Sequence, residues 1–181
     1  MHTMPGYIAG TWNIDPAHSE IGFAARHMMI SRVRGKFAGF EGSITTARNP
    51  LESTAVAVID LASISTGNDQ RDAHLRSADF FSADSDPKMT YRSTGIRENG
   101  DGLRVDGELT IRGITRPVTL DVEVHGIGVD NYGQTRLGCS ATGEISRADF
   151  GMTWNVVLDG GGFLVSDTIQ LILEVAAVLQ K

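Results

Sequence analysis

The sequence has little that would support a disulfide, a membrane span or a nucleic-acid site. Cys139 is the single cysteine among 181 residues, which excludes an internal disulfide and fits a reducing compartment. No apolar run approaches the roughly 18 residues that a membrane-spanning helix needs, so we expect no integral membrane segment. Lysine and arginine number 16 against 22 acidic residues, a net charge of -6, and they form no basic stripe. Nucleic acid is therefore not an expected partner.

The first residues, MHTMPGYIAGTW, lack the basic segment and the long apolar segment of a secretory signal. From this we expect a cytoplasmic location. A chain of 181 residues is long enough for one domain with a real core and short for two. Since no linker or internal repeat divides it, we expect an N-terminal extension over residues 1–10 and one domain over residues 11–181.

The stretch from Gly102 to Gly126 shows the clearest pattern in the chain. Apolar and polar residues alternate along residues 103–112, and the alternation resumes along residues 118–125. Because side chains on a strand point alternately to opposite faces, both runs are predicted to be strands with one apolar and one solvent-facing side. The segment between them, GITRP, contains glycine and proline, which favours a turn and an antiparallel hairpin.

Further strands are predicted at regular spacing along the chain. They cover residues 11–14, 19–29, 33–46, 54–64, 88–96, 135–146 and 168–178. In the second of these, Met29 falls on the same side as Ile21 and Phe23. In the third, Phe37 and Phe40 have opposite parity, and a bulge at Gly39 would bring both rings to one side. About eight long strands with short turns favour a sandwich or an up-and-down barrel, and the lack of a protected edge strand favours closure.

Two segments break the strand pattern. Residues 68–81 do not alternate, and Asn68 or Asp69 can cap a helix, so we expect one helix of about two turns with an apolar plug beside it. Residues 149–167 are rich in glycine and aromatic residues; they form either a surface loop or, as their apolar side chains favour, a lid over an apolar interior. The prediction is an all-β chain: an eight-stranded antiparallel β-barrel with one short helix and a long lid loop.

Small residues on the inner side of the predicted strands leave volume inside the barrel. They are Ala25, Ala55, Ala57, Gly107, Cys139, Ala141 and Gly143. An eight-stranded barrel has just enough interior to be filled by side chains or to hold one small ligand. A volume bounded by isoleucine, leucine, valine and phenylalanine would favour an apolar guest.

Several segments resemble the signature segments of the YceI-like family. They are GTWNIDPAHSEIGFAARHMMISRVRGKFAGFEGSI, RDAHLRSADFF followed by DPKMTY, GELTIRGITRPVTL, and ISRADFG. They occur in the family's order and span nearly the whole chain. The resemblance implies a lipocalin-like β-barrel that binds polyisoprenoid-type lipids or other long-chain amphiphiles inside and is not an enzyme. Many members are secreted to the periplasm, and this chain differs from them in showing no signal.

We therefore expect the chain to bind and sequester or carry a long-chain apolar ligand, such as a polyisoprenoid or an isoprenoid quinone. The residues expected to line the tunnel are Ile21, Phe23, Phe37, Phe40, Leu109, Leu120, Val122, Leu171 and Leu173. Those expected to close its ends are Phe80, Phe81, Phe150 and Trp154. Because a methylene more or less changes little except fit, chain-length specificity should be loose.

A polar head group would need hydrogen-bond partners at the rim. Arg71 and His74 lie beside the expected plug and could bind a carbonyl, a carboxylate or a phosphate, and His27 is expected on the inner face. The alternative is that Arg71 and Asp72 only fasten the helix to the barrel. Arg147 is expected to form a salt bridge with Asp149 that anchors the lid loop.

No catalytic or metal motif is apparent. The five histidines and the lone cysteine lack the short ligand spacings of structural zinc sites, so we expect no metal and no cofactor, although His18, His27 and His74 could converge in space. The sequence has no G-x-S-x-G nucleophile motif and no carboxylates that can be paired. Two alternatives stay open: a filled barrel acting as a stress or interaction module, and an enzyme using His27 or His74 as base. A homodimer stays open as well.

Overall fold

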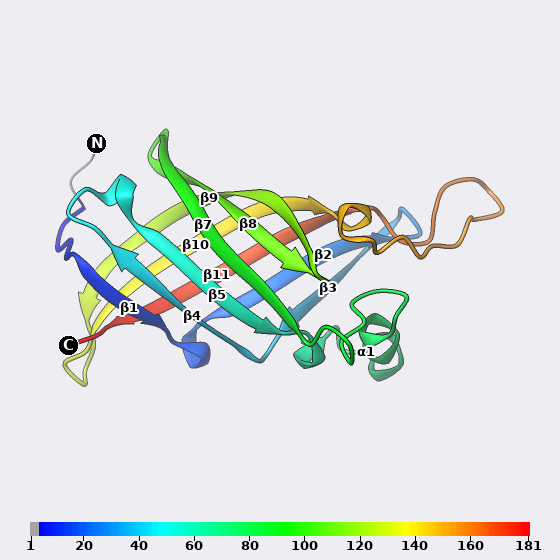
Figure 1. The fold of residues 1–181 in the computed structure, drawn as a ribbon, viewed down its shortest axis with the longest axis horizontal. Coiled ribbons are helices and arrows are strands. Elements are labelled where there is room, and N and C mark those ends of the chain that lie inside the picture. The colour runs from blue at the N-terminus through cyan, green and yellow to red at the C-terminus, as the bar shows by residue number, and fades with distance from the viewer. Residues whose placement is uncertain (1–3) are drawn as a thin grey trace.

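The computed structural model describes residues 4–181, which form a closed, antiparallel β-barrel with one short helix (Figure 1). The strands are β1 (Gly10–Ile14), β2 (Glu20–His27), β3 (Ser31–Phe37), β4 (Phe40–Thr46), β5 (Thr54–Asp60), β6 (Ile64–Ser65), β7 (Lys88–Asn99), β8 (Gly102–Ile111), β9 (Ile114–Val129), β10 (Thr135–Ser146) and β11 (Thr168–Leu179). The helix is α1 (Asp69–Arg76), and short 3-10 turns are η1 (Pro16–His18), η2 (Pro50–Glu52), η3 (Leu61–Ser63) and η4 (Arg147–Phe150). No helix in this part of the chain is long and apolar enough to cross a membrane.

Eight strands form the ring, in the order β1-β4-β5-β7-β8-β9-β10-β11, and β1 pairs with β11 to close it. β11 is long enough to hold two partners on the same edge: β1 pairs with its last residues and β2 with its first half. β3 and the two-residue β6 continue the sheet from β2. The predicted eight-stranded antiparallel barrel with one short helix is confirmed.

Two predicted strands end earlier than the sequence pattern suggested. The run 33–46 is divided into β3 and β4, because residues 38 and 39 turn away to bond the β5 end: the Ala38 N–H donates to the Ser63 carbonyl, and the Gly39 carbonyl accepts from the Asp60 N–H. The break lets both Phe37 and Phe40 pack in one core cluster, as the predicted bulge would have done. The run 19–29 ends at His27, so Met29 lies in an exposed turn and its predicted inward position is wrong.

The β8–β9 hairpin turns over two residues rather than over the whole GITRP segment. Arg112 and Gly113 have φ angles of 54° and 73°, the left-handed pair that matches the twist of a tight hairpin. β9 therefore starts at Ile114, and Pro117 lies within the strand opposite Glu108. β10 pairs with β9 only from Asp121 onward, so the missing N–H of Pro117 lies outside that ladder.

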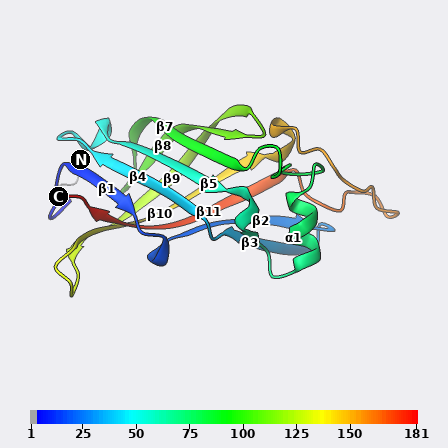
Figure 2. The ribbon, with the colours of Figure 1, turned by 60° about the horizontal axis from the view of Figure 1, so that its bottom comes forward.

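The helix α1 lies at the barrel end opposite the two termini, beside β2 and β3 (Figure 2). The Asn68 side chain caps its first turn by accepting from the Arg71 N–H at 2.9 Å. The chain then passes through residues 77–87 to β7, with the Leu61 N–H bonded to the Pro87 carbonyl. β6 pairs with β3, and α1 packs against β6.

Candidate functional site

The interior of the barrel holds a cavity of about 960 Å³. Inward side chains of nearly every strand line it, and they are predominantly apolar. It runs from Met4 and Tyr7, near the termini, to Gln70 and His27, near α1. This volume lies at the upper end of the range of about 300–1,000 Å³ that small-molecule sites occupy.

Most of the residues proposed from the sequence as ligand-binding are inward-facing. Fourteen of the sixteen line the cavity: Ile21, Phe23, His27, Phe37, Arg71, His74, Phe80, Phe81, Leu109, Leu120, Val122, Trp154, Leu171 and Leu173. They come from β2, β3, β8, β9 and β11, from the α1 region and, for Trp154, from the loop of residues 151–167. The period-two pattern brought together the strand residues among them, although they are far apart in sequence. Their contact with a ligand stays a prediction.

Phe40 and Phe150 lie outside the cavity wall. Phe40 packs against the core cluster at the start of β4, and Phe150, fully buried, anchors η4 in that cluster. Both residues therefore pack in the core beside the cavity, and neither is among the residues that line it.

The small inward residues explain where the volume comes from. Five of the seven identified from the sequence line the cavity: Ala25, Ala55, Ala57, Cys139 and Ala141. The two glycines are covered instead: a Cβ at Gly107 would overlap the Tyr91 hydroxyl, and one at Gly143 would lie 2.9 Å from Leu120 Cδ2. These glycines make room for a neighbouring side chain, not for a ligand.

Tyr91, on β7, brings a polar atom into this apolar wall. Among residues 4–181, its hydroxyl is the one buried side-chain nitrogen or oxygen without a hydrogen-bond partner. Burial raises the pKa of Tyr91 to about 12, with a smaller contribution from the charge of Asp106. The hydroxyl therefore stays protonated near neutral pH and keeps an unused donor beside the cavity.

An aromatic cluster joins α1 to the lid loop, residues 151–167. The His74 ring lies edge-on to Trp154, with centroids 4.6 Å apart, and edge-on to Phe80, with centroids 5.1 Å apart. Its Nε2 lies 2.9 Å from an Asp79 carboxylate oxygen. His74 thus has a partner already, and its ring closes this end of the cavity together with Phe80 and Trp154.

Arg71 and Asp72 fasten α1 to the segment before it. The guanidinium of Arg71 donates to the hydroxyl and the carbonyl of Thr66, at 2.7 and 2.9 Å. The buried Asp72 carboxylate accepts from the Thr66 N–H and hydroxyl, at 2.9 and 2.6 Å. The pair therefore has a structural role, but it fastens α1 to the segment that leads into it rather than directly to a barrel strand, and Arg71 also lines the cavity.

Arg147 anchors the lid loop, but the expected salt bridge with Asp149 is wrong. Its side chain is only 4% exposed, and its guanidinium donates to four backbone carbonyls of the lid loop, those of Ser166, Met152, Trp154 and Val165, at 2.8–3.2 Å. The guanidinium also lies 5.8 Å from the centroid of the Phe80 ring. Burial lowers the pKa of Arg147. The side chain thus replaces backbone ladder bonds that the irregular lid loop lacks.

Cys139 and the histidines do not assemble into a reactive or metal-binding cluster. Burial raises the pKa of the Cys139 thiol to about 11, so it lines the cavity as a small neutral group. Within residues 4–181 no group of three or more histidine, cysteine or acidic side chains is placed to hold a metal ion. His18 pairs with Asp15 while His74 pairs with Asp79 at the other end, and His2 lies outside the described residues.

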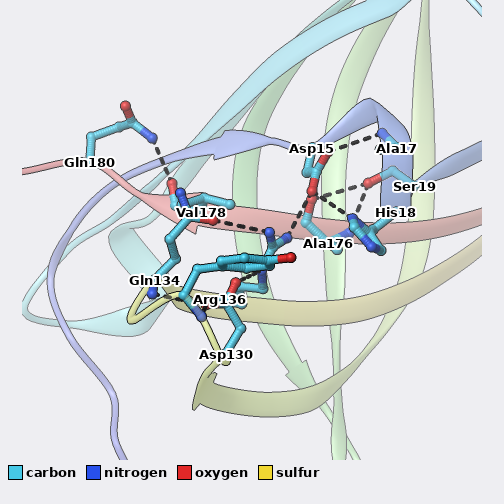
Figure 3. A network of polar contacts seen from close by, with 11 residues as sticks. Asp15, Ala17, His18, Ser19, Asp130, Gln134, Arg136, Ala176, Val178 and Gln180 are labelled. Carbon is cyan, nitrogen blue, oxygen red and sulfur yellow. Dashed lines mark hydrogen bonds and ion pairs between the residues drawn. The ribbon is translucent and has the colours of Figure 1, made fainter.

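A network of charged groups holds the opposite end of the barrel (Figure 3). Arg136 on β10 donates to Asp15 at 2.8 Å and to Asp130 at 2.6 Å, and His18 lies 2.7 Å from Asp15. The hydrogen bonds from Arg136 and then His18 lower the pKa of Asp15 to about 2. Because Asp15 follows β1 and Asp130 precedes β10, this network ties the closing strand to the β9–β10 turn.

The sequence analysis missed Tyr91 and Arg147 as cavity residues. The signal for Tyr91 was present, since Tyr91 lies two residues after Met89 in a predicted strand and therefore points to the same, inward face. Arg147 had no such signal, because it follows the last residue of β10 and its direction depends on where the lid loop returns.

Comparison with known proteins gives relatives over the whole chain. Residues 12–177 match the model of the YceI-like domain family. Protein YceI of Escherichia coli strain UMN026 is 36% identical over 177 residues, covering 96% of this chain and 90% of that protein. Protein YceI of Salmonella newport strain SL254 is 34% identical over 184 residues, covering 100% of this chain and 93% of that protein.

Solved structures share the fold. A Campylobacter jejuni YCEI protein superposes with a TM-score of 0.73 at 31% identity, covering 98% of this chain and all of that one. Burkholderia cenocepacia BcnA gives a TM-score of 0.78 at 24% identity, covering 90% and 98%. A polyisoprenoid binding domain from Saccharophagus degradans, implicated in plant cell wall breakdown, gives 0.70 at 17% identity, covering 96% and 100%. On the family match and the identities above 30% over nearly full length, the chain belongs to the YceI-like domain family.

Proposed function

We propose that the barrel binds a long-chain apolar ligand, a polyisoprenoid, an isoprenoid quinone or a similar amphiphile, and sequesters or carries it. The observation on which this rests is the cavity of about 960 Å³ that extends through the barrel between mainly apolar walls. Burying several hundred Å² of prenyl or acyl chain contributes on the order of 10 kcal/mol before the losses on association. Micromolar or tighter binding therefore requires no strong polar contact.

The polyisoprenoid binding domain from Saccharophagus degradans supports the class of ligand, since it has the same fold. A second support is the distribution of polar groups along the wall. The Tyr91 hydroxyl is an uncommitted donor that a quinone carbonyl or an alcohol could use. Arg147 and Arg71, by contrast, are already bonded to the protein, which leaves Arg26, at the α1 end of the wall, as the lining guanidinium outside the ion pairs found in residues 4–181.

The proposal is binding without turnover. A filled barrel acting as an interaction module is disfavoured by the cavity itself. A catalytic role for His74 is disfavoured by its surroundings, because its ring packs between Phe80 and Trp154 and its Nε2 lies at hydrogen-bond distance from Asp79.

The test is uptake of an isoprenoid quinone and of a long-chain fatty acid by delipidated protein, followed by native mass spectrometry. Ala57→Trp should reduce uptake of both, because Ala57 lines the cavity and a large ring would fill it without burying a charge. Leu120→Asp, also in the wall, should abolish uptake by placing a carboxylate in the apolar path. Thr90→Asp is the matched control, since Thr90 is exposed on the outer face of β7.

One-to-one complexes that the Ala57 and Leu120 variants lose and the Thr90 variant keeps would support the proposal. Absence of uptake by the wild-type protein would overturn it. Equal uptake by the wild-type protein and a folded Ala57→Trp variant would overturn the cavity as the site.

A further inference from the structure

Large apolar side chains are exposed together at the α1 end of the barrel. The turn between β2 and β3 holds three in succession, and the small hairpin of residues 156–164 within the lid loop holds three more. We call them the apolar rim: Met28, Met29, Ile30, Val156, Val157 and Phe163. Their exposed fractions reach 83% at Ile30, 72% at Val157 and 54% at Phe163. Exposed apolar side chains that cluster in this way mark interaction sites in folded proteins.

The two segments form one surface. The Met28 N–H donates to the Leu164 carbonyl at 2.8 Å, and His27 forms a β-bridge with Val165. A side chain at Gly162 would begin 2.6 Å from the Met29 sulfur, so the methionine lies directly on the lid hairpin. Figures 1 and 2 both show the β2–β3 turn and the lid loop projecting from the same end of the barrel.

The turn chemistry indicates that the methionines are not there for folding. Met28 and Met29 have φ angles of 53° and 62°, a left-handed pair in which tight hairpins favour asparagine and glycine. Two methionines in this conformation are strained, and exposure means that burial does not compensate. Strain at an exposed apolar tip favours a role in binding.

Basic groups lie directly behind the rim. Arg26 and Arg32 are opposite each other in the β2–β3 pairing and are exposed, as are Arg34 and Lys36 further along β3. Like charges placed opposite one another destabilise a strand pair. None of the ion pairs found in residues 4–181 includes any of the four, and the lid hairpin adds one acidic residue, Asp159. The exposed side of β2 and β3 behind the rim is therefore basic in a chain whose net charge is -6, whereas α1 and the segment after it carry the acidic residues of this end, among them Asp69, Asp79 and Asp84.

The rim continues into the cavity. Leu164 and Val165 line the cavity and flank the exposed hairpin residues, and Arg26 and His27 line it on the β2 side. A ligand that leaves the barrel at this end therefore passes from one apolar surface to the next.

We propose that this end docks on the surface of a bilayer that contains anionic lipids. The apolar rim enters the boundary between head groups and acyl chains, and the arginines behind it contact lipid phosphates. Two projecting tips backed by basic groups suit a deformable apolar layer with a charged surface better than they suit a shaped protein partner. The docking surface stands on its own geometry, and its role in exchanging ligand with the membrane rests on the proposed function.

The test is co-sedimentation with vesicles of phosphatidylcholine alone and of phosphatidylcholine mixed with phosphatidylglycerol. Ile30→Ser combined with Phe163→Ser should weaken binding to the mixed vesicles by tenfold or more, because two apolar side chains no longer enter the bilayer. Arg26→Gln should weaken it about fivefold, with little change on neutral vesicles, and added salt should reduce binding by the wild-type protein. Val129→Ser with Tyr132→Ser is the matched control, since both residues are exposed at the opposite end.

Binding that the rim variant loses and the control keeps would support the docking surface. Absence of wild-type binding to the mixed vesicles, or equal loss in the rim variant and the control, would overturn it. A rim variant that changes the oligomeric state while vesicle binding is unaffected would show that the rim contacts a second copy of the chain. That result would overturn the proposal that the rim docks on a membrane.

Quinone uptake measured without vesicles separates this inference from the proposed function. Rim-dependent vesicle binding by a protein that takes up no lipid would leave the docking surface standing and the carrier function overturned. Quinone uptake by a protein that does not bind vesicles would leave the proposed carrier function standing and overturn the docking surface.

Discussion

At the end of the barrel where the termini lie, β1 pairs with β11 and Arg136 joins two carboxylates from distant segments, whereas at the α1 end an irregular loop closes the wall. The first end also buries Trp12 completely, with its indole N–H bonded to the Thr46 hydroxyl at 2.8 Å. The second end relies on Arg147, on the aromatic contacts of His74 and on turns whose apolar tips face solvent. One end is closed by strand pairing and the other by side chains.

This difference bears on how a ligand could enter. Segments with few ladder hydrogen bonds open locally at a lower free energy than paired strands do. The lid loop between Met152 and Ser166 has no strand ladder to its surroundings and is held by Arg147 and an isolated bridge to His27, so we expect the α1 end to open while the terminal end stays closed. The predictions below compare the two ends, beginning with the largest expected effect.

Removing Arg147 should be the most damaging single change. Arg147→Met removes a donor from four buried or half-buried carbonyls, of which only that of Val165 keeps another donor, the Asn155 side-chain amide. We expect the free energy of unfolding to fall by about 3 kcal/mol or more. Urea denaturation measures this change. Arg92→Met is the control, because Arg92 pairs with Glu108 on the exposed face and should contribute about 1 kcal/mol or less. Equal effects of the two substitutions would contradict the account of the lid anchor.

At the terminal end, Thr46→Val should destabilise the barrel by about 2 kcal/mol. The Thr46 hydroxyl accepts from the Trp12 indole and donates to the Ile8 carbonyl at 2.7 Å, so valine leaves buried polar groups unpaired. Thermal denaturation reports the loss. Quinone uptake at low temperature should be unchanged, because valine adds no bulk or charge at Thr46 in the cavity wall and this end is not the proposed entry; a selective loss of uptake in the folded variant would argue that it is.

Asp15→Asn should lower stability by about 1–2 kcal/mol at pH 7, because Arg136 and His18 lose their anionic partner. The pKa of Asp15 is lowered from 3.8 to about 2, so its contribution is complete above about pH 4 and is lost as the pH falls toward 2. Urea midpoints of the wild-type protein and the variant should therefore converge between pH 4 and pH 2. A gap that stays constant over this range would contradict the assignment.

Tyr91→Phe should have the smallest effect on stability, a change within about 0.5 kcal/mol, since the hydroxyl has no partner to lose. Its effect should appear in ligand choice instead. Affinity for a prenylated quinone should fall relative to a hydrocarbon of similar length, as measured by competition. An unchanged ratio would remove Tyr91 as a contact for the polar group.

The strands of the barrel could be predicted from the local alternation of apolar and polar residues, whereas the conformation of the irregular segments could not. The alternation over residues 135–146 gave the bounds of β10, because a half-buried strand forces period two on its sequence. The exposed position of Met29 could not be predicted in that way, since the alternation of the preceding strand runs on through a turn whose conformation methionine does not favour. Arg147 was predicted to pair with a carboxylate, but its acceptors are carbonyls placed by the tertiary path of the lid loop.

The candidate site was predictable to the extent that it consists of inward strand positions. Leu109, Leu120 and Leu171 line the cavity because their strands keep register around the ring. Phe150 does not, because it belongs to a 3-10 turn outside that register. Small inward residues leave cavity volume only where no neighbouring side chain covers them. Tyr91 covers Gly107, and the sequence pattern does not show this because it depends on side-chain packing.

The central claim is that the cavity holds a long-chain apolar molecule, and it is tested most directly by native mass spectrometry of freshly purified protein, followed by organic extraction and identification of the bound material. The account predicts a co-purifying prenyl quinone or another long-chain amphiphile in a one-to-one complex. A mass equal to that of the chain alone, with no uptake when isoprenoid quinones and fatty acids are added, would contradict it.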